Sequence, residues 1–319
     1  MKIYKNENTD PYFNLASEQY LLDNEEDDVF MLWRNSPAVI IGRNQNAYAE
    51  INRKFVTENN IAVVRRLTGG GAVFHDLGNI NFTFITKKGE TGALDFARFC
   101  QPVIDALRAL GVPAELSGRN DMTANGRKFS GNAQCVYNGR VMHHGTLLFD
   151  ADMTKMSGAL NADLEKMKSN GVKSVRARVC NLKEYLPDMS VTELKSYLES
   201  SMGQSSVPFS DGQIKGIEKL KKEKYESWEW DYGKSKEFAK TVKKRFPFGT
   251  VEISYTSEHG VLTDVMIRGD YFGEADTGVL EGSLKGIRLC RSDLLEKLQL
   301  SDKYIFGSKP EDIAELFEL

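Results

Sequence analysis

The chain has 319 residues, of which 41% are hydrophobic and 27% charged, and this composition is typical of a soluble globular protein with one large domain or two ordinary ones. A formal net charge of −3 argues against a protein whose main task is to neutralise nucleic-acid phosphates. The N-terminal residues lack the apolar core of a signal peptide, and no stretch approaches the roughly 18 apolar residues of a membrane span. We therefore expect a cytoplasmic protein that engages neither nucleic acid nor membrane.

The N-terminal part of the chain alternates between helical and strand-like patterns. Helical spacing of apolar residues predicts a helix over residues 14–22, and β-rich runs predict strands over residues 29–34 and 38–42. A further helix is expected over residues 49–60, followed by strands over residues 61–64 and 79–85.

The middle of the chain predicts one long helix and a meander. Residues 95–110 form an amphipathic pattern that ends at Gly111, a typical C-cap residue. Asn125-Gly126 and Asn138-Gly139 are each flanked by strand-like runs, which predicts an antiparallel meander over residues 120–149. Other helices are expected near residues 153–160, 164–170, 191–202 and 212–224.

The C-terminal part has the pattern of a separate small domain. A helical stretch is expected to end near Arg245, and residues 246–249 interrupt the pattern. Residues 250–269 predict a hairpin that turns at Glu258-His259-Gly260, and helix-like stretches follow near residues 291–298 and 311–319. This order predicts a small α+β domain at the end of the chain.

The stretch RRLTGGGAVFHDLGNINFTF at residues 65–84 predicts a binding site. Its three glycines at 69–71 can take positive φ and admit a close neighbour, and successive N–H groups in such a turn can converge on an anion. Arg65 or Arg66 can add a planar charge, and because neighbours on a strand face opposite ways we expect Arg66 to face the site. The pattern indicates a phosphate or carboxylate site, with an ordinary glycine-rich hairpin as the alternative.

The segment GRNDMTANGRKFSGNAQ at residues 118–134 adds further polar groups. Asn120 and Asp121 suit a hydrated Mg²⁺, which needs few protein ligands when phosphates supply the rest. Lys128, in a strand beside Gly131, can grip a phosphoryl or carbonyl oxygen as charge develops on it, although a solvated surface cation is the alternative. The sequence has no GxxxxGK[ST] motif, so any nucleotide here is not held by a P-loop.

Histidines and cysteines give no metal or disulfide pattern. His143 and His144 are adjacent, so on a strand they point to opposite faces and cannot act as one pair. The four cysteines lack CxxC spacing, which favours reduced thiols over a zinc site or disulfides.

Five ordered motifs together resemble the lipoate–protein ligase family. This family belongs with the biotin protein ligases among enzymes that form an acyl-adenylate and pass the acyl group to a lysine. The motifs are RRLTGGGAVFHDLGNINFTF (65–84), GRNDMTANGRKFSGNAQ (118–134), HHGTLLFDAD (143–152), SVRARVCNL (174–182) and SWEWDYG (227–233). The resemblance implies an α+β fold, in which a catalytic domain with a large mixed or antiparallel sheet (residues 1–246) precedes a small α+β accessory domain (residues 250–319).

The resemblance also implies a two-step reaction. Lipoic acid would be activated by ATP to lipoyl-AMP with release of pyrophosphate, and Mg²⁺ would assist. The lipoyl group would then pass to a lysine of a lipoyl domain, carried by an E2 subunit of an α-keto-acid dehydrogenase or by the H protein of glycine cleavage. Because the acceptor must reach an adenylate that was shielded from water, we expect the C-terminal domain to move between the steps.

Individual residues take implied roles from the same resemblance. Lys128 would bind the carbonyl and phosphate oxygens of the adenylate, and Asn120 with Asp121 would face the phosphates and Mg²⁺. The glycine stretch would follow the lipoyl tail and the adenylate phosphate, and His75 with Asn79 would shape the nucleotide side. The full implied binding set, besides those three polar residues, is Arg66, Thr68, Gly69, Gly70, Gly71, His75, Asn79, Gly131, His144 and Gly145.

Apolar residues near the same motifs could form a narrow bore for the lipoyl tail. They are Trp33, residues 39–41, Val73 and residues 133–136. Each of them is equally compatible with a place in the hydrophobic core.

Two other functions fit the same residues. An acyltransferase of this fold would move octanoyl or lipoyl groups between proteins without ATP, through a thioester on Cys180 or, as a second candidate, Cys135. A non-catalytic binder of lipoate or lipoyl-AMP is the other alternative, although such a protein has no need of both Lys128 and Asp121.

Overall fold

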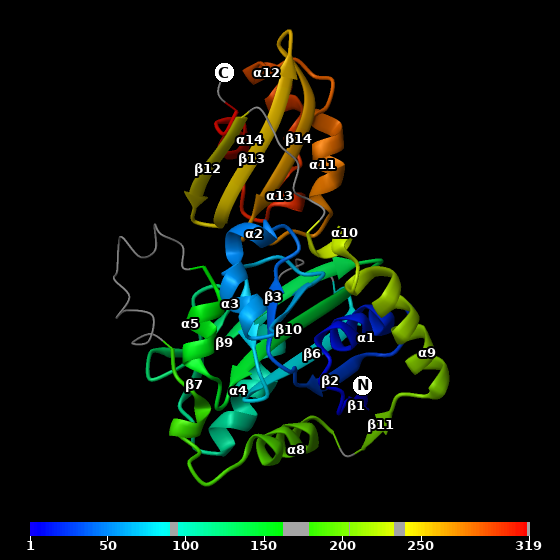
Figure 1. The fold of residues 1–319 in the computed structure, drawn as a ribbon, viewed down its shortest axis with the longest axis vertical. Coiled ribbons are helices and arrows are strands. Elements are labelled where there is room, and N and C mark those ends of the chain that lie inside the picture. Colours follow the sequence, from blue (N-terminus) through cyan, green and yellow to red (C-terminus); the bar gives the residue numbers. More distant parts are fainter. Residues whose placement is uncertain (90–94, 162–178, 204, 233–239, 318–319) are drawn as a thin grey trace.

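The computed structural model describes residues 1–89, 95–161, 179–203, 205–232 and 240–317. A large domain lies below a smaller C-terminal one in Figure 1. An eight-stranded sheet with the order β11-β1-β2-β6-β10-β9-β8-β7 forms the centre of the large domain. Its strands are β1 (Lys2–Lys5), β2 (Val29–Trp33), β6 (Asn79–Lys87), β7 (Ala114–Ser117), β8 (Asp121–Ala124), β9 (Arg127–Tyr137), β10 (Arg140–Leu148) and β11 (Ser206–Pro208). β1 is parallel to both its neighbours and the other pairs are antiparallel, so the sheet is mixed.

Strand β2 shows that both faces of this sheet are covered. Its side chains alternate, with Phe30 and Leu32 in one hydrophobic core and Val29, Met31 and Trp33 in another. A strand that is buried on both faces reads as a continuous apolar run, which is the pattern of this segment.

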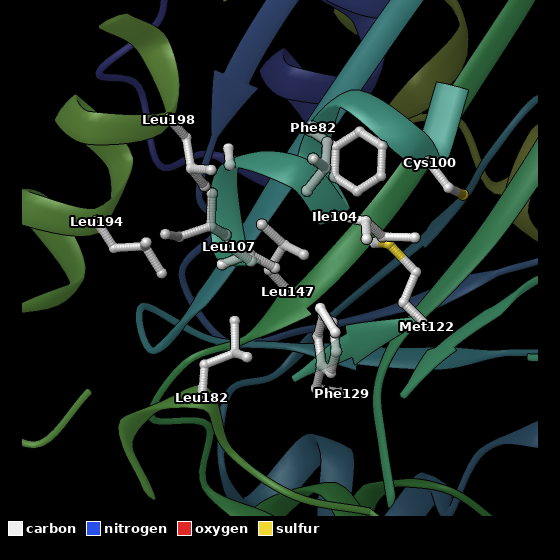
Figure 2. Close-up of a cluster of buried hydrophobic side chains, with 14 of the residues drawn as sticks. Phe82, Cys100, Ile104, Leu107, Met122, Phe129, Leu147, Leu182, Leu194 and Leu198 are labelled. Carbon is white, nitrogen blue, oxygen red and sulfur yellow. The ribbon is translucent and has the colours of Figure 1, made fainter. Parts of the chain in front are cut away.

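Helices α4 (Phe96–Ala109) and α8 (Val191–Met202) cover one face of the sheet. Figure 2 shows Leu107 of α4 beside Leu194 and Leu198 of α8, with Phe82 and Leu147 of the sheet in the same cluster. Helices α1 (Pro11–Asn24) and α9 (Asp211–Leu220), with the π-helix η2 (Lys221–Tyr225), contribute to the core on the other face. The 3-10 helix η1 (Leu182–Glu184) adds Leu182 to the first core.

A second, three-stranded sheet carries the glycine stretch. It has the order β4-β3-β5, from β3 (Ala38–Ile41), β4 (Ala62–Arg65) and β5 (Val73–His75). β3 is parallel to β4 and antiparallel to β5, so the glycine-rich connection from β4 to β5 crosses the end of β3. The short helices α2 (Ala47–Glu50), α3 (Arg53–Glu58) and α5 (Met153–Ala159) pack against this sheet, and α10 (Trp228–Asp231) contacts β4.

The C-terminal domain packs helices against its own three-stranded antiparallel sheet. The strands are β12 (Lys240–Phe246), β13 (Gly249–Glu258) and β14 (Val261–Gly269), and the helices are α11 (Thr277–Leu284), α12 (Arg291–Lys297), α13 (Ser301–Tyr304) and α14 (Pro310–Ala314). A separate hydrophobic core lies between these elements. The predicted α+β class, with a large mixed sheet and a small C-terminal domain, is therefore confirmed.

Several local predictions are confirmed, and three need correction. The helix over residues 95–110 and the hairpins at Asn125-Gly126 and Asn138-Gly139 are present, with positive φ at all four turn residues. The helix expected to end near Arg245 is wrong, because these residues form β12 and pair with β13. The single helix expected over residues 49–60 is two helices, α2 and α3, because Ile51 between them forms a β-bridge with Leu160. The last helix, expected over residues 311–319, is the shorter α14 (Pro310–Ala314). The helix expected near residues 164–170 lies outside the described residues.

Candidate active site

A pocket of about 380 Å³ opens between the two sheets of the large domain and the C-terminal domain. One end of it is buried and the other is exposed. The buried end is formed by Leu15, Trp33, Ile40, His75, Asn81 and His144, each less than 9% exposed. The open end carries the charged and polar residues Arg119, Asn120, Asp121, Lys128, Arg245 and Asp270. A ligand with a charged head and an apolar tail matches this division.

Arg66 lies along the pocket wall and organises the glycine stretch. Its Nη2 donates hydrogen bonds to the carbonyl oxygens of Gly69 (2.6 Å) and Gly71 (2.8 Å), and its Nε donates to Thr68 Oγ1 (2.9 Å). The pKa of Arg66 is lowered to about 10, mainly by burial; the charge of Glu18 opposes this shift and that of nearby Arg65 adds to it. The guanidinium is therefore a charged anchor for the loop, as well as part of the pocket lining.

Arg65 points away from the pocket, and all of its side-chain hydrogen bonds go to backbone. Its guanidinium donates to five carbonyl oxygens, those of Gly42, Arg43, Gln45, Trp230 and Asp231. The backbone N–H of Arg65 also donates to Asp231 Oδ1 at 2.7 Å. Arg65 thus ties the WEWD segment of α10 and the loop after β3 to the end of β4.

A buried chain of hydrogen bonds supports the glycine stretch from behind. Thr68 Oγ1 lies 2.7 Å from His144 Nε2, and His144 Nδ1 lies 2.9 Å from Glu18 Oε1. Thr83 donates to the same carboxylate oxygen at 2.6 Å, and Trp33 Nε1 donates to Thr83 Oγ1 at 2.9 Å. These contacts join β10, α1, β6 and β2 to the loop, so its position is coupled to the main sheet.

Lys128 and Asp121 form an ion pair at the open end. Nζ of Lys128 lies 2.7 Å from Asp121 Oδ1, and the two side chains are 40% and 38% exposed. A side chain on Gly131 would meet Lys128 Nζ at 3.2 Å, so the glycine leaves room for the lysine to lie over the strand. The pair presents a cation and a carboxylate side by side at the mouth of the pocket.

Asn120 is locked to Asn132 across the β8–β9 hairpin. Asn120 Nδ2 donates to Asn132 O at 2.7 Å, and Asn132 Nδ2 donates back to Asn120 O at 3.0 Å. Asn132 Oδ1 also lies 3.3 Å from His143 Nε2, in the buried ring cluster that includes Phe82 and Phe99. The turn that carries Asn120 and Asp121 is therefore fixed from the core.

The C-terminal domain closes one wall of the pocket. Gly70 N donates to Tyr271 O at 3.2 Å, and a side chain on Gly69 would meet that oxygen at 2.3 Å. Phe272, 1% exposed, packs against Phe96 with ring centroids 5.4 Å apart, and the Arg119 guanidinium lies 4.4 Å from the Phe272 ring centroid. Two of the three glycines are thus required because another domain lies on them.

Most of the implied site residues line one pocket. These are Arg66, Gly70, Gly71, His75, Asn120, Asp121, Lys128, Gly131, His144 and Gly145. Thr68, Gly69 and Asn79 do not line it: Thr68 and Gly69 face their packing partners, and Asn79 donates to Asn81 Oδ1 at 3.0 Å. His75 lies at the buried end rather than with the charged residues. Of the residues expected for the bore, Trp33, Ile40, Val73 and Ala133 line the pocket, whereas Val39, Ile41 and residues 134–136 are not part of its lining.

Sequence reasoning missed residues from two sources. Glu18 lies within an otherwise unremarkable helix, and nothing in its spacing marks it as the buried partner of His144. Arg245, Asp270 and Phe272 come from the C-terminal domain, and a linear pattern carries no sign of which domain surfaces meet. Arg119 belongs to the motif at residues 118–134, and its positive charge was the signal that could have marked it as a site residue.

Cys180 does not have the surroundings of a nucleophile. It is 1% exposed, its Sγ donates to the backbone oxygen of Arg127 at 3.5 Å, and burial raises its pKa. Burial raises the pKa of Cys135 to about 12. Neither cysteine is among the described residues that line the pocket. The acyltransferase alternative is not favoured, because an acyl-accepting cysteine must be ionised and face the acyl group.

A glycine-walled pocket with cations at its mouth and apolar side chains among the residues of its buried end is suited to an enzyme that activates an amphipathic acid. Residues 10–203 match the family description "Lipoyl protein ligase A/B catalytic domain", and residues 235–317 match "Bacterial lipoate protein ligase C-terminus". The lipoate-protein ligase LplJ of Bacillus subtilis is 42% identical, and the match covers 96% of each chain. The chain belongs to the lipoate–protein ligase family.

Solved structures agree with this assignment. Plasmodium falciparum LipL1 in complex with lipoate is 26% identical, with a TM-score of 0.82 over 98% of each chain. A bi-partite lipoate protein ligase from Thermoplasma acidophilum, described with its E2 lipoyl domain, is 25% identical with a TM-score of 0.67 and covers 75% of this chain and 98% of its own. A lipoate-protein ligase A bound with ATP, 24% identical over 73% of this chain and 98% of its own, has the same fold with a TM-score of 0.61.

Within the described residues, no helix is both long and apolar enough to span a bilayer, and no group of three or more metal-ligating side chains occurs.

Proposed function

We propose that this protein is an ATP-dependent lipoate–protein ligase that forms lipoyl-AMP and transfers the lipoyl group to a lysine of an acceptor protein. The observation that carries the proposal is the pocket itself, in which Lys128, Asp121 and the Gly70–Gly71 wall surround the mouth of a cavity that leads to the apolar side chains of Leu15, Trp33 and Ile40. Family membership supports the same reaction.

In the first step, a carboxylate oxygen of lipoate attacks the α-phosphorus of ATP and pyrophosphate leaves. Both reactants are anions, so cations and N–H donors must hold them in line. Lys128 is suited to this because its ammonium group is partly exposed at the mouth and is compensated by Asp121 until an anion arrives. Arg66 keeps the glycine wall in place through its bonds to Gly69 and Gly71.

In the second step, a neutral lysine amine of the acceptor attacks the carbonyl carbon of the mixed anhydride and AMP leaves. Negative charge grows on the carbonyl oxygen, and the Lys128 ammonium is the group that we assign to stabilise it. Lys128 stabilises charge and is not itself acylated.

Asp121 and Asn120 fit Mg²⁺. The ion pair occupies only one of the two carboxylate oxygens of Asp121, and the side chain is 38% exposed. Since Mg²⁺ keeps several waters and takes its other ligands from phosphates, one or two protein oxygens suffice. When bound, the ion would neutralise charge on the phosphates of ATP and the leaving pyrophosphate.

The C-terminal domain, expected over residues 250–319, is proposed as an accessory domain that moves between adenylation and transfer. Its contacts with the large domain include ion pairs and a backbone hydrogen bond beside the Phe272–Phe96 packing. They include Arg43 Nη2 to Asp276 Oδ2 (2.6 Å), Lys88 Nζ to Glu274 Oε2 (3.0 Å) and Gly269 N to Asn44 O (3.0 Å). Strand β12 belongs to the same sheet, so the moving unit would begin by Lys240 rather than Thr250.

The proposed acceptor is a lipoyl domain, of an E2 subunit or of a glycine cleavage H protein, and we propose that the enzyme works in the cytoplasm. The test is lipoate-dependent exchange between ATP and labelled pyrophosphate, followed by mass spectrometry of an E2 lipoyl domain and an H protein incubated with the enzyme. Exchange and a lipoylated lysine are expected. Protein-to-protein transfer without exchange would instead indicate the thioester transferase, and binding without either reaction would indicate a non-catalytic binder.

A further inference from the structure

The imidazole of His75 carries an unused hydrogen-bond donor at the buried end of the pocket. His75 is 3% exposed, and its Nε2 has no hydrogen-bond partner among the described residues. The other polar groups at this end are engaged. Trp33 Nε1 donates to Thr83, both ring nitrogens of His144 have partners, and Asn81 Oδ1 accepts from Asn79.

A network of asparagines fixes which ring nitrogen of His75 bears the proton. Asn14 Nδ2 faces the carbonyl oxygens of Asn8 and Arg34, so it must be the amide nitrogen, and it also donates to Asn35 Oδ1 at 2.9 Å. This leaves Asn35 Nδ2 facing His75 Nδ1 at 3.1 Å. Because an amide nitrogen only donates, Nδ1 of His75 accepts and the ring proton lies on Nε2.

The ring is also uncharged. Burial, the nearby charge of Arg66 and the His144 ring together lower the pKa of His75 to about 3, and burial is the largest cause. His75 therefore offers one neutral N–H to whatever occupies the buried end. A buried donor left without a partner is costly, and a pocket that contains one favours ligands that supply an acceptor.

We propose that His75 donates its Nε2–H to a sulfur of the dithiolane ring and so makes this enzyme prefer lipoate to saturated acyl chains. The inference rests on the proposed function, since the carboxylate of lipoate at Lys128 directs the opposite end of the chain inward. A saturated chain such as octanoate presents only C–H groups there and leaves the donor unpaired. A sulfur is a weak acceptor, but it is the one that this acid carries at its ring end.

The experiment measures kcat/KM for adenylate formation with lipoate and with its carbocyclic analogue, in which a cyclopentane ring replaces the dithiolane. This comparison separates the sulfur acceptor from the shape of the ring. For the unmodified protein we expect lipoate to be favoured by about tenfold, the size of one buried neutral hydrogen bond. In His75→Phe, which keeps a ring without the donor, the ratio should fall towards one, through loss on lipoate and gain on the analogue. In His75→Gln, which keeps an N–H at a similar reach, much of the preference should return.

The outcomes separate the two proposals. Equal kcat/KM for lipoate and the carbocycle in the unmodified protein would overturn the role of His75. This measurement does not depend on whether a variant folds. A His75→Phe protein that loses both substrates equally would also overturn it, because this is the effect of a structural defect. If the unmodified protein forms no adenylate from either acid, the proposed ligase activity itself fails.

Discussion

Lys128 Nζ and Asp121 Oδ1 lie 2.7 Å apart at the mouth of the pocket, on neighbouring strands β9 and β8. Each side chain is more than a third exposed, so the pair adds little to the stability of the fold. We propose that its value is functional: the carboxylate holds the Lys128 ammonium in place until an anionic substrate or a metal ion competes for one of the partners.

Replacing Lys128 with Ala should lower lipoate-dependent adenylate formation about 100-fold or more, the typical loss when a group that stabilises developing charge is removed. The free energy of unfolding should change by less than about 1 kcal/mol, because the lost ion pair is solvated. Pyrophosphate exchange and urea unfolding measure the two effects. Lys128→Arg is the matched control, since a guanidinium keeps the positive charge but lacks the compact shape of the ammonium group. Near-normal exchange in the Ala variant would contradict the assigned role.

Replacing Asp121 with Asn should raise the Mg²⁺ concentration needed for half-maximal adenylation several-fold, because an amide oxygen is a weaker ligand than a carboxylate. Titrations of Mg²⁺ at saturating ATP and lipoate measure this. Glu274, which is also an acid but pairs with Lys88 outside the pocket, provides the control in a Glu274→Gln variant. A shift of equal size in both variants would show that the effect is one of surface charge alone.

Replacing Phe272 with Ala should loosen the C-terminal domain, since a fully buried aromatic side chain that packs against Phe96 is removed. Truncation of a buried Phe costs about 3 kcal/mol or more, and here much of that loss falls on the contact between domains. Small-angle scattering should record a larger radius of gyration. Leu300→Ala removes an apolar side chain that is 66% exposed in the same domain and should leave the dimensions unchanged. Identical scattering from both variants would rule out this role for Phe272.

Replacing Cys180 with Ala should leave both adenylation and transfer intact. Its thiol is buried and bonded to a backbone oxygen, so the expected cost is only about 1 kcal/mol of stability from the lost atom. Mass spectrometry of the acceptor measures transfer, and thermal unfolding measures the cost. A folded variant that adenylates lipoate but cannot transfer it would revive the thioester route.

Asp231 should make stability depend on pH. Burial raises the pKa of its carboxyl to about 7, although the Arg65 N–H bond and the charge of Arg65 oppose this. The unfolded carboxyl titrates near 3.9, so between about pH 4 and pH 7 the folded chain holds a proton that the unfolded chain has lost, and stability falls as pH rises through that window. Asp231→Asn removes this contribution. Measured by urea unfolding, the free energy of unfolding of the variant should rise relative to that of the unmodified protein between pH 5 and pH 8. A difference between the two proteins that does not change with pH would contradict the raised pKa.

The features that local residues determine were predictable. The Asn-Gly turns set their hairpins through residues that tolerate positive φ, and the apolar face of residues 95–110 set α4. The stretch before Phe246 was misread because KTVKKRF has charges that suit either a helix or an edge strand, and only its pairing with β13 decides between them.

The site was predictable where its residues lie in dense motifs, and not where two distant surfaces meet. Lys128, Asp121 and the glycines come from two such motifs, and the structure brings them to one pocket. The glycines were expected to admit a ligand, whereas Gly69 and Gly70 also admit the backbone and ring of Tyr271 and Phe272. Nothing local to residues 69–71 specifies a partner some 200 residues away, because that contact depends on how whole domains dock.

The bond from Gly70 N to Tyr271 O carries a further consequence. A backbone amide has one hydrogen, so a ligand oxygen that accepts it must displace the carbonyl of Tyr271. Ligand binding at this atom and docking of the C-terminal domain are then competing equilibria, and linkage makes the competition symmetric. If docking of the domain lowers the affinity for the ligand by some factor, binding of the ligand lowers the docking equilibrium constant by the same factor. A titration with the ligand therefore also measures the separation of the two domains.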